Sequence, residues 1–228
     1  MELTMFERIQ LLPLFQGLSI RQLQQIFEKI KLDFCQNKER ETIVMRGERH
    51  NQLVYVLSGR YSAEYVSVSG KFRFQEQLEA PALLEPEGIF GYNQDYLRTY
   101  KFITTGSTFL IEKNVFKNYL INFDVVRTNM LNLLSTHIQK SQQQAWNLKQ
   151  NGTIEKKIIR FFCLHSTVMS GYKMVKVKME DLADMLGESR SNVSRGLNNL
   201  QDQNILELKR MGIIMNSLEK ALSSTFYE

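Results

Sequence analysis

The sequence predicts an α+β protein in three parts: an antiparallel β-roll, a long helix, and a helix–turn–helix followed by a β-hairpin. Three observations predict it. Short β-branched and aromatic runs alternate with glycines between about residues 33 and 112. The stretch from Asn114 to about Gln150 contains neither glycine nor proline. Two short amphipathic segments then flank Gly187, and two short apolar runs follow them.

Composition predicts an ordinary folded protein in the cytoplasm. The chain has 228 residues, 43% hydrophobic and 23% charged, which excludes a disordered polymer. No stretch approaches the roughly 18 apolar residues that a membrane span requires, and Glu2 and Glu7 stand where an export signal would carry lysines. We therefore expect no membrane partner.

Charge and cysteine content exclude several kinds of site. The net charge is +5, but residues 151–228 hold 11 Lys and Arg against 9 Asp and Glu, so bulk charge does not locate a nucleic-acid surface. Cys35 and Cys163 are too few for a structural zinc ion, an iron–sulfur cluster or a disulfide framework. Both are predicted to be buried free thiols.

The first element is predicted to be helical. In "SIRQLQQIFEKI" Ser19 can act as N-cap, and the apolar residues fall on one face: Leu23, Ile26, Phe27 and Ile30. From about residue 33 the period changes to that of short strands, with turns expected at Gly47, Gly59, Gly70 and Gly106. Closely spaced strands of this kind are typical of an antiparallel sandwich or roll.

The long helix carries a second apolar pattern. Its apolar residues recur at alternating steps of three and four, as in a coiled-coil seam. A helix of about 30 residues would be about 45 Å long, more than a small domain covers, so a second copy of the chain is the expected partner. The predicted dimer interface is Leu131, Leu134, Ile138, Ala145 and Leu148. A long helix that lies on its own domain remains the alternative.

After Thr153, a candidate N-cap, the chain reads helix, strand, helix, turn, helix and hairpin. This order is that of a winged helix-turn-helix, which binds DNA. Gly187 can take the positive φ that the turn needs. The outer face of the second helix would carry Ser189, Arg190, Ser191, Asn192 and Arg195, and the wing would carry Lys209 and Arg210. An arginine there can bond to guanine O6 and N7.

The segment "VKVKMEDLADMLGESRSNVSRGLNNLQDQNIL" resembles the DNA-binding end of the bacterial Crp/Fnr regulators, the family of the cyclic-AMP receptor protein. "LPLFQGLSIRQLQQI" and "ETIVMRGERHNQLVYVLSGRYSAEY" resemble the family's opening helix and first hairpins. The resemblance implies a cyclic-nucleotide-binding-like jelly roll at residues 1–112, a dimerisation helix at 113–150 and a winged helix-turn-helix at 151–228. It implies a homodimer on near-palindromic double-stranded DNA, with RNA polymerase as a further candidate partner.

The resemblance also implies roles for single residues. The residue matching Arg190 contacts a guanine, and the one matching Arg195 contacts bases or phosphates. Those matching Ser189 and Asn192 touch the DNA backbone. Ser191 stands where many relatives carry a glutamate, so the preferred half-site is expected to differ.

The sequence does not identify the effector. Cyclic-nucleotide binders of this family carry a Gly-Glu pair and an Arg-Ser-Ala run, whereas this chain has Glu85-Pro86 and "YLR". Cyclic AMP is therefore not expected, and neither is an iron–sulfur cluster, because the cysteine cluster of the oxygen-sensing branch is missing. Haem, reported for some nitrosative-stress regulators of the family, stays open, with His50, His137 and His165 as candidate ligands. The candidate effector pocket is Glu85, Glu87, Tyr92 and Arg98.

Two other classes of protein fit the sequence less well. A β-roll enzyme or cupin-like metalloprotein needs clustered histidines and carboxylates inside the roll, and only His50 falls there. A ligand-binding β-roll signalling protein that does not bind DNA would leave the C-terminal part without a role. The sequence therefore predicts a non-enzymatic regulator without a metal site.

Overall fold

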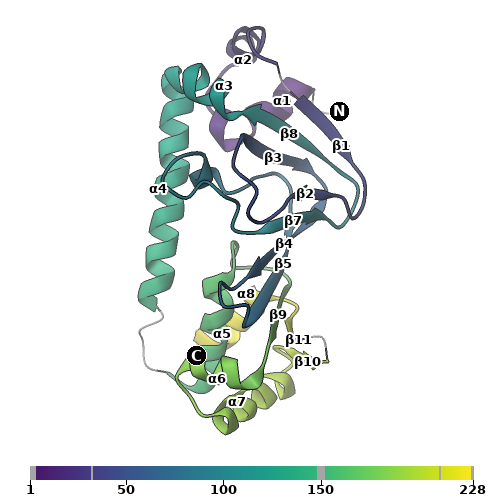
Figure 1. Ribbon diagram of the computed structural model, residues 1–228, viewed down its shortest axis with the longest axis vertical. Helices are drawn as coiled ribbons and strands as arrows, with labels where there is room; N and C mark the ends of the chain where they lie inside the picture. Colours follow the sequence, from purple (N-terminus) through teal and green to yellow (C-terminus); the bar gives the residue numbers. More distant parts are fainter. Residues whose placement is uncertain (1–3, 32, 148–151, 211, 227–228) are drawn as a thin grey trace. The chain divides into compact units, whose positions relative to one another are not determined.

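The computed structural model describes residues 4–31, 33–147, 152–210 and 212–226 (Figure 1). The chain divides into two compact units. The roll unit comprises Met1–Tyr61, Glu79–Leu97 and Lys101–Gln139. The helix-turn-helix unit comprises Ser62–Leu78, Arg98–Tyr100 and Lys140–Glu228. No described helix is long and apolar enough to cross a membrane.

The roll unit begins with short helices: α1 (Met5–Gln10), η1 (Pro13–Phe15) and α2 (Ile20–Phe27). Ser19 caps α2 as predicted: its Oγ accepts from the Gln22 N–H, and the Gln22 side chain accepts from the Ser19 N–H. The apolar residues of α2 pack into the core of the roll because they share one helix face.

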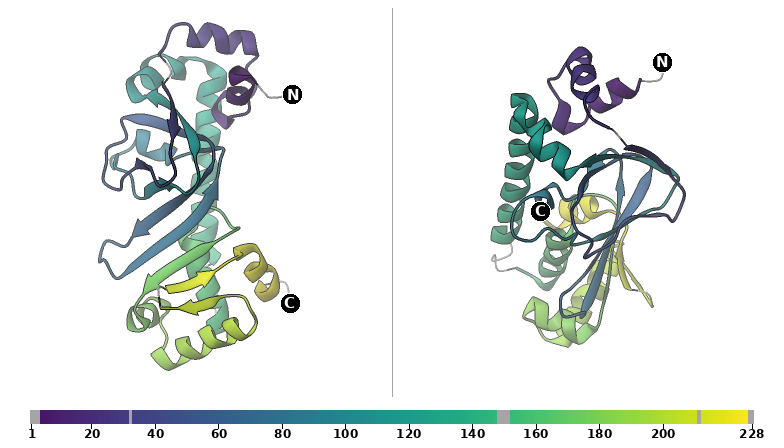
Figure 2. Two further views of the ribbon diagram at one scale, coloured as in Figure 1. Left: turned by 90° about the vertical axis from the view of Figure 1, so that its right-hand side faces the viewer. Right: turned by 45° about the horizontal axis from the view of Figure 1, so that its top comes forward.

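The roll unit contains a four-stranded antiparallel sheet. Its order is β1 (Asp33–Asn37), β8 (Gly106–Glu112), β3 (Gln52–Ser58) and β6 (Ala82–Leu83). Further short elements of the chain are β2 (Thr42–Val44), η2 (Pro86–Ile89) and β7 (Thr99–Phe102). The strands curve into a roll (Figure 2). Its core is aromatic and includes Phe15, Tyr55 and Phe109. The antiparallel roll is confirmed.

Three helices follow β8: α3 (Lys113–Asn118), η3 (Leu120–Asn122) and α4 (Asp124–Asn147). The first turns of α4 are covered by the roll unit, where Val126 and Met130 are buried in its core. Leu131 and Ile138 further along are exposed by 59% and 57%. The helix therefore leaves the cover of the roll core part-way along its length.

The helix-turn-helix unit contains α5 (Ile154–His165), α6 (Met179–Leu186), α7 (Arg190–Asp202) and α8 (Leu218–Phe226). Thr153 caps α5, accepting from the Lys156 N–H. Its strands are β9 (Lys173–Val177), β10 (Glu207–Lys209) and β11 (Gly212–Met215), which lie side by side in the order β10-β11-β9 (Figure 2). The predicted order of helices, turn and hairpin is confirmed.

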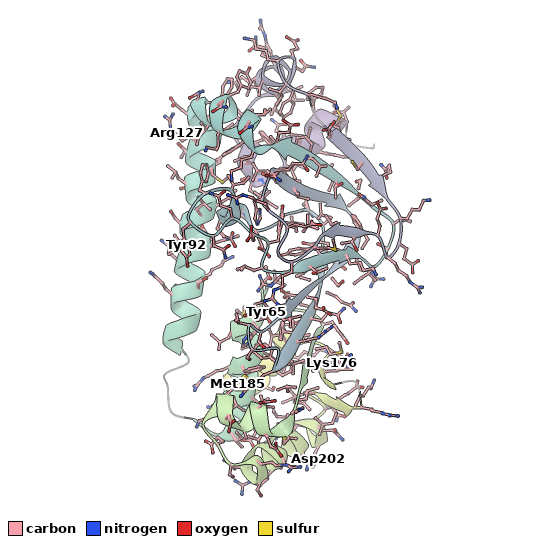
Figure 3. All side chains as sticks on the ribbon, in the orientation of Figure 1. Tyr65, Tyr92, Arg127, Lys176, Met185 and Asp202 are labelled. Atoms are coloured by element: carbon pink, nitrogen blue, oxygen red, sulfur yellow. The ribbon has the colours of Figure 1, made fainter. Side chains whose placement is uncertain are left out.

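This sheet continues into a hairpin from the first third of the chain. Strand β9 pairs with β5 (Phe72–Glu79), from Phe72↔Val177 to Glu76↔Lys173, and β5 lies beside β4 (Arg60–Val66). Phe72 and Phe74 belong to the core of the helix-turn-helix unit. Tyr65, labelled in Figure 3, lies on β4, and its ring centroid is 5.9 Å from that of Phe72. The domains predicted from the sequence are three continuous segments divided at residues 112 and 150. The contacts in the structure instead group Ser62–Leu78 with the C-terminal part of the chain.

A buried ion pair fixes the same hairpin. The Lys173 ammonium lies 2.8 Å from Glu76 Oε2, and both side chains are at most 1% exposed. The Glu76 carboxylate also accepts from the Thr167 N–H at 3.0 Å and from the Thr167 hydroxyl. These donors satisfy a carboxylate whose burial would otherwise cost several kcal/mol, of order 3 to 5.

Candidate nucleic-acid interface

The turn between α6 and α7 follows from Gly187. This residue ends α6 in the left-handed conformation, with φ 64° and ψ 38°, and its N–H bonds to the carbonyls of Ala183 and Asp184. A side chain at this φ would be strained. Leu182 and Ala183 of α6 and Val193 of α7 are buried in one core, which fixes how the two helices cross.

Gly196 brings α7 close to α5. A Cβ atom at position 196 would lie 2.6 Å from Ile154 Cγ2, closer than real Cβ contacts. One face of α7 is therefore pressed against α5, and the opposite face remains exposed. An open surface on that face is lined by Arg190, Ser191, Ser194, Arg195, Asn198 and Asn199.

The N-terminus of α7 is capped by a serine side chain and carries an arginine at its first helical position. Ser189 is the N-cap, and its Oγ accepts from the Asn192 N–H at 3.1 Å. The remaining N–H groups in the first turn of a helix have no intrahelical acceptor, and the helix dipole favours an anion there. Arg190 is the first helical residue, and its guanidinium lies 3.5 Å from Glu180 Oε1 of α6, with both side chains largely exposed.

A chain of hydrogen bonds holds Arg195. Lys157 Nζ of α5 donates to Glu188 Oε1 at 2.5 Å, and Asn192 Nδ2 donates to Glu188 Oε2 at 2.7 Å. Arg195 Nη2 then donates to Asn192 Oδ1 at 2.6 Å. The hydrogen bonds from Lys157 and Asn192 hold the pKa of the Glu188 carboxyl below its usual value, so it is ionised at neutral pH.

The wing adds two cations. Lys209 ends β10 and lies 2.7 Å from Glu207 Oε2, and the hydrogen bond to Glu207 raises the pKa of the Lys209 ammonium. Arg210 follows it and is exposed. Both wing residues that the sequence singles out therefore lie at the surface.

Residues 156–220 match the family model of the Crp-like helix-turn-helix domain. This part of the chain is a Crp-like helix-turn-helix domain. The match covers α5 through the beginning of α8, so it contains the whole of α7 and the wing.

The match to one solved structure extends the likeness to the fold of the rest of the chain. The catabolite activator protein of Thermus thermophilus matches with a TM-score of 0.50 at 14% identity, over 94% of this chain and 99% of that chain. Regulator CLP of Xanthomonas campestris, described as c-di-GMP-responsive, matches at 17% identity with a TM-score of 0.48, over 81% of this chain and 94% of that chain. DNR of Pseudomonas aeruginosa matches at 18% identity with a TM-score of 0.45, over 97% and 98%. No curated protein matches significantly.

The resemblance to Crp/Fnr regulators is therefore confirmed, by the family model at the Crp-like domain and by the likeness to the Thermus protein for the fold of the chain. The open surface of α7 also includes Ser194, Asn198 and Asn199, which the DNA contacts predicted from the sequence do not contain. Ser194 and Asn198 lie four and eight positions after Arg190, and Asn199 lies eight positions after Ser191. Residues at these spacings share one face of a helix, so the sequence contains the signal that places them beside the predicted contacts. Asn199 is partly committed, because its Nδ2 donates to Glu155 Oε1 at 2.9 Å.

The four predicted effector residues have different neighbours. Glu85 has a positive φ of 37° and is buried, and its carboxylate accepts from the Leu97 N–H at 2.8 Å. Glu87 pairs with His137 of α4 at 3.3 Å. Tyr92 is fully exposed (Figure 3). Arg98 belongs to the helix-turn-helix unit and donates to the His165 carbonyl at 3.3 Å. The effector pocket stays a prediction.

His50 and His165 both lie against other residues of the protein, but the buried Nε2 of His50 has no hydrogen-bond partner among the described residues. The His50 ring is buried against Tyr96, with Nε2 3.8 Å from Glu85. His165 Nδ1 lies 2.8 Å from the Phe161 carbonyl oxygen, and burial lowers the pKa of its imidazole. Among the residues that the structure describes, no three His, Cys, Asp or Glu side chains cluster as a metal site. Cys35 and Cys163 are free and half-buried, and burial raises the pKa of the Cys163 thiol to about 11.

The predicted dimer residues lie on or beyond α4. Leu131 and Ile138 are exposed, while Leu134 packs partly against the roll core. The Ala145 side chain and Leu148 lie outside the described residues. The described part of the helix therefore offers two uncovered apolar side chains at the predicted seam.

Proposed function

We propose that the chain is a homodimeric transcription regulator of the Crp/Fnr type that binds a specific double-stranded DNA sequence in the cytoplasm. One observation carries the proposal. The exposed face of α7, in a domain that matches the Crp-like helix-turn-helix, starts at a Ser189 cap and carries Arg190 and Arg195. Such a helix end fits the major groove of DNA, with arginines at base edges and first-turn N–H groups at a phosphate.

Dimerisation is proposed through α4. Leu131 and Ile138 are seven positions apart, so they lie on one stripe of the helix, and both are more than half exposed. Pairing of two such stripes would remove apolar surface from water. Two copies of α7 would then reach successive major grooves about 34 Å apart, on a near-palindromic site. An effector in the roll unit would act by changing how the two α4 helices pack.

The decisive experiment is selection from a random double-stranded DNA pool by the purified full-length protein without added ligand. A palindromic consensus with half-sites about one helical turn apart would support the dimeric regulator. If no consensus is enriched, the selection is repeated with cell extract added as a source of effector. Weak, salt-dependent binding without a consensus in both selections would contradict sequence-specific recognition.

Replacing Arg190 with alanine should weaken binding to the selected sequence by about 1 to 3 kcal/mol and relax the choice at one base pair. The reason is loss of a two-pronged contact with one guanine. Affinities for the consensus and its single-base variants measure it. Lys220→Ala on α8 removes a cation from the same unit and should leave the base preference unchanged. Equal weakening on every sequence would make Arg190 a phosphate contact instead.

Replacing Ile138 with aspartate should dissociate the dimer, because the charge would be buried in an apolar seam. Sedimentation velocity at micromolar concentration should show the mass of one chain. Thr136→Asp places the same charge on another face of α4, also exposed, and should leave the dimer intact. An unchanged dimer in Ile138→Asp would show that α4 pairs through another face or not at all.

A further inference from the structure

We infer that Glu188 is a positioning residue that fixes the guanidinium of Arg195 for sequence readout. The inference deepens the proposed function and rests on it. Glu188 lies in the turn before α7 and has no direct contact with Arg195; it acts through Asn192. It is therefore outside the set of DNA-contacting residues that the sequence predicts.

The chemistry of the three groups dictates how the connection works. A carboxylate only accepts hydrogen bonds, so the Asn192 amide must turn its NH₂ group toward Glu188. Its carbonyl oxygen Oδ1 is then directed to the other side, where Arg195 Nη2 donates to it at 2.6 Å. The orientation of one amide thus decides whether Arg195 meets an acceptor or a donor.

Glu188 is itself anchored on the helix that packs behind α7. Its Oε1 accepts from Lys157 of α5 at 2.5 Å, and the two side chains are about three quarters buried. The opposite charge of Lys157 offsets the negative charge of Glu188, so the carboxylate is held close to the DNA-facing surface with little repulsion of a phosphate. Each of its two oxygens has one donor, which leaves the carboxylate little freedom to turn.

Arg190 provides the internal contrast. Its carboxylate partner, Glu180, lies at 3.5 Å, and the two side chains are 70% and 76% exposed. A pair so exposed and so distant does not hold one rotamer. The hydrogen bond of Arg195 is also at the surface, but it is short, at 2.6 Å, and its acceptor Asn192 is held by Glu188, so Arg195 is the more ordered of the two arginines before DNA binds. Ordering a long side chain on binding costs entropy, and the arranged arginine avoids part of this cost. Its fixed direction also disfavours base pairs that could be contacted only from another rotamer, and this difference gives the discrimination.

The test compares Glu188→Gln with Glu180→Gln in the full-length protein. Both remove one negative charge beside a candidate recognition arginine. The glutamine amide at 188 has one acceptor oxygen where the carboxylate has two, so either Lys157 or Asn192 loses its acceptor. Binding is measured on the selected consensus, on every single-base variant and at several salt concentrations, with Arg195→Ala as the reference profile.

We expect Glu188→Gln to lose about five- to tenfold of the discrimination at the base pairs that Arg195→Ala affects, with an unchanged salt slope. Adding Glu188→Gln to Arg195→Ala should have no further effect, because the two act on one contact. Glu180→Gln should change affinity on all sequences alike. Asn192→Ala, which interrupts the chain at its middle, should lose discrimination at the same base pairs as Glu188→Gln, and the loss of the predicted backbone contact of Asn192 should add a weakening that is equal on every sequence.

The inference is overturned by an unchanged base profile in Glu188→Gln, by weakening that is uniform over sequences, or by effects additive with Arg195→Ala. Failure of the proposed function looks different, because the wild-type protein itself would then select no consensus. If Glu188→Gln melts at a lower temperature than the wild type, the profile of Asn192→Ala decides, since that change leaves the Lys157–Glu188 pair in place.

Discussion

Replacing Glu76 with alanine is expected to lower the free energy of unfolding by about 3 to 5 kcal/mol. The substitution leaves the Lys173 ammonium buried without its counter-charge, which lies at 2.8 Å in the wild type. It also removes the acceptor of the Thr167 N–H and hydroxyl. Urea unfolding followed by circular dichroism measures the loss, and hydrogen exchange should show the lost protection in β9 first.

The same hairpin offers a matched control. Glu64 pairs with Arg73 at 3.8 Å between β4 and β5, where the two side chains are 40% and 60% exposed. Glu64→Ala should change the free energy of unfolding by less than about 0.5 kcal/mol, because exposed ion pairs contribute little. A loss below about 1 kcal/mol in Glu76→Ala would mean that Lys173 reaches water and that the pair is not buried in solution.

A fragment of residues 151–228 is expected not to fold by itself, although it contains the complete helix-turn-helix. The fragment lacks Phe72 and Phe74, whose rings contact Phe161 and Phe162 in the core. Losing one buried phenylalanine costs about 3 to 5 kcal/mol, and a whole domain is stable by only about 5 to 15 kcal/mol. Strand β9 would also lose its partner β5. A proton–nitrogen NMR spectrum should show the narrow dispersion of an unfolded chain.

The control for this fragment restores the missing strands. Residues 62–78 joined to residues 151–228 by a flexible linker should recover a dispersed spectrum and a cooperative thermal transition. The hairpin is then the cause of the difference, since the two chains share all other residues. A cooperative transition in the fragment of residues 151–228 alone would show that the helix-turn-helix unit does not depend on the hairpin.

Much of the fold could be predicted because its signals are local. Ser19 and Thr153 cap helices from positions that the sequence marks by itself, and Gly187 takes the left-handed conformation of the turn. Each signal involves residues within one turn of the helix that it starts or ends. The outer face of α7 was recognised for the same reason, but only over its first two turns.

The contacts between distant segments could not be predicted. The pattern of "KMVKVK" predicts a half-buried strand, but it does not indicate that this strand, β9, pairs with β5. Lys173 shares the buried face with Val175, so the charge stands where the pattern would place an apolar residue. Its partner Glu76 is 97 positions away. The role of Glu188 was hidden in the same way, because it depends on Lys157, 31 positions before it in α5.

The pairing of β5 with β9 limits how this protein can exchange parts with its relatives. Recombination near residue 150 would transfer the recognition helix together with α5 and the wing, but would leave behind the strand that completes their sheet. A chimera made at that junction takes residue 76 from one parent and residue 173 from the other. Glu76 or Lys173 is then buried without its partner, unless the other parent carries the opposite charge at the matching position. On the proposed function, we therefore expect point changes on α7 to alter DNA specificity with less loss of stability than exchange of the whole C-terminal segment.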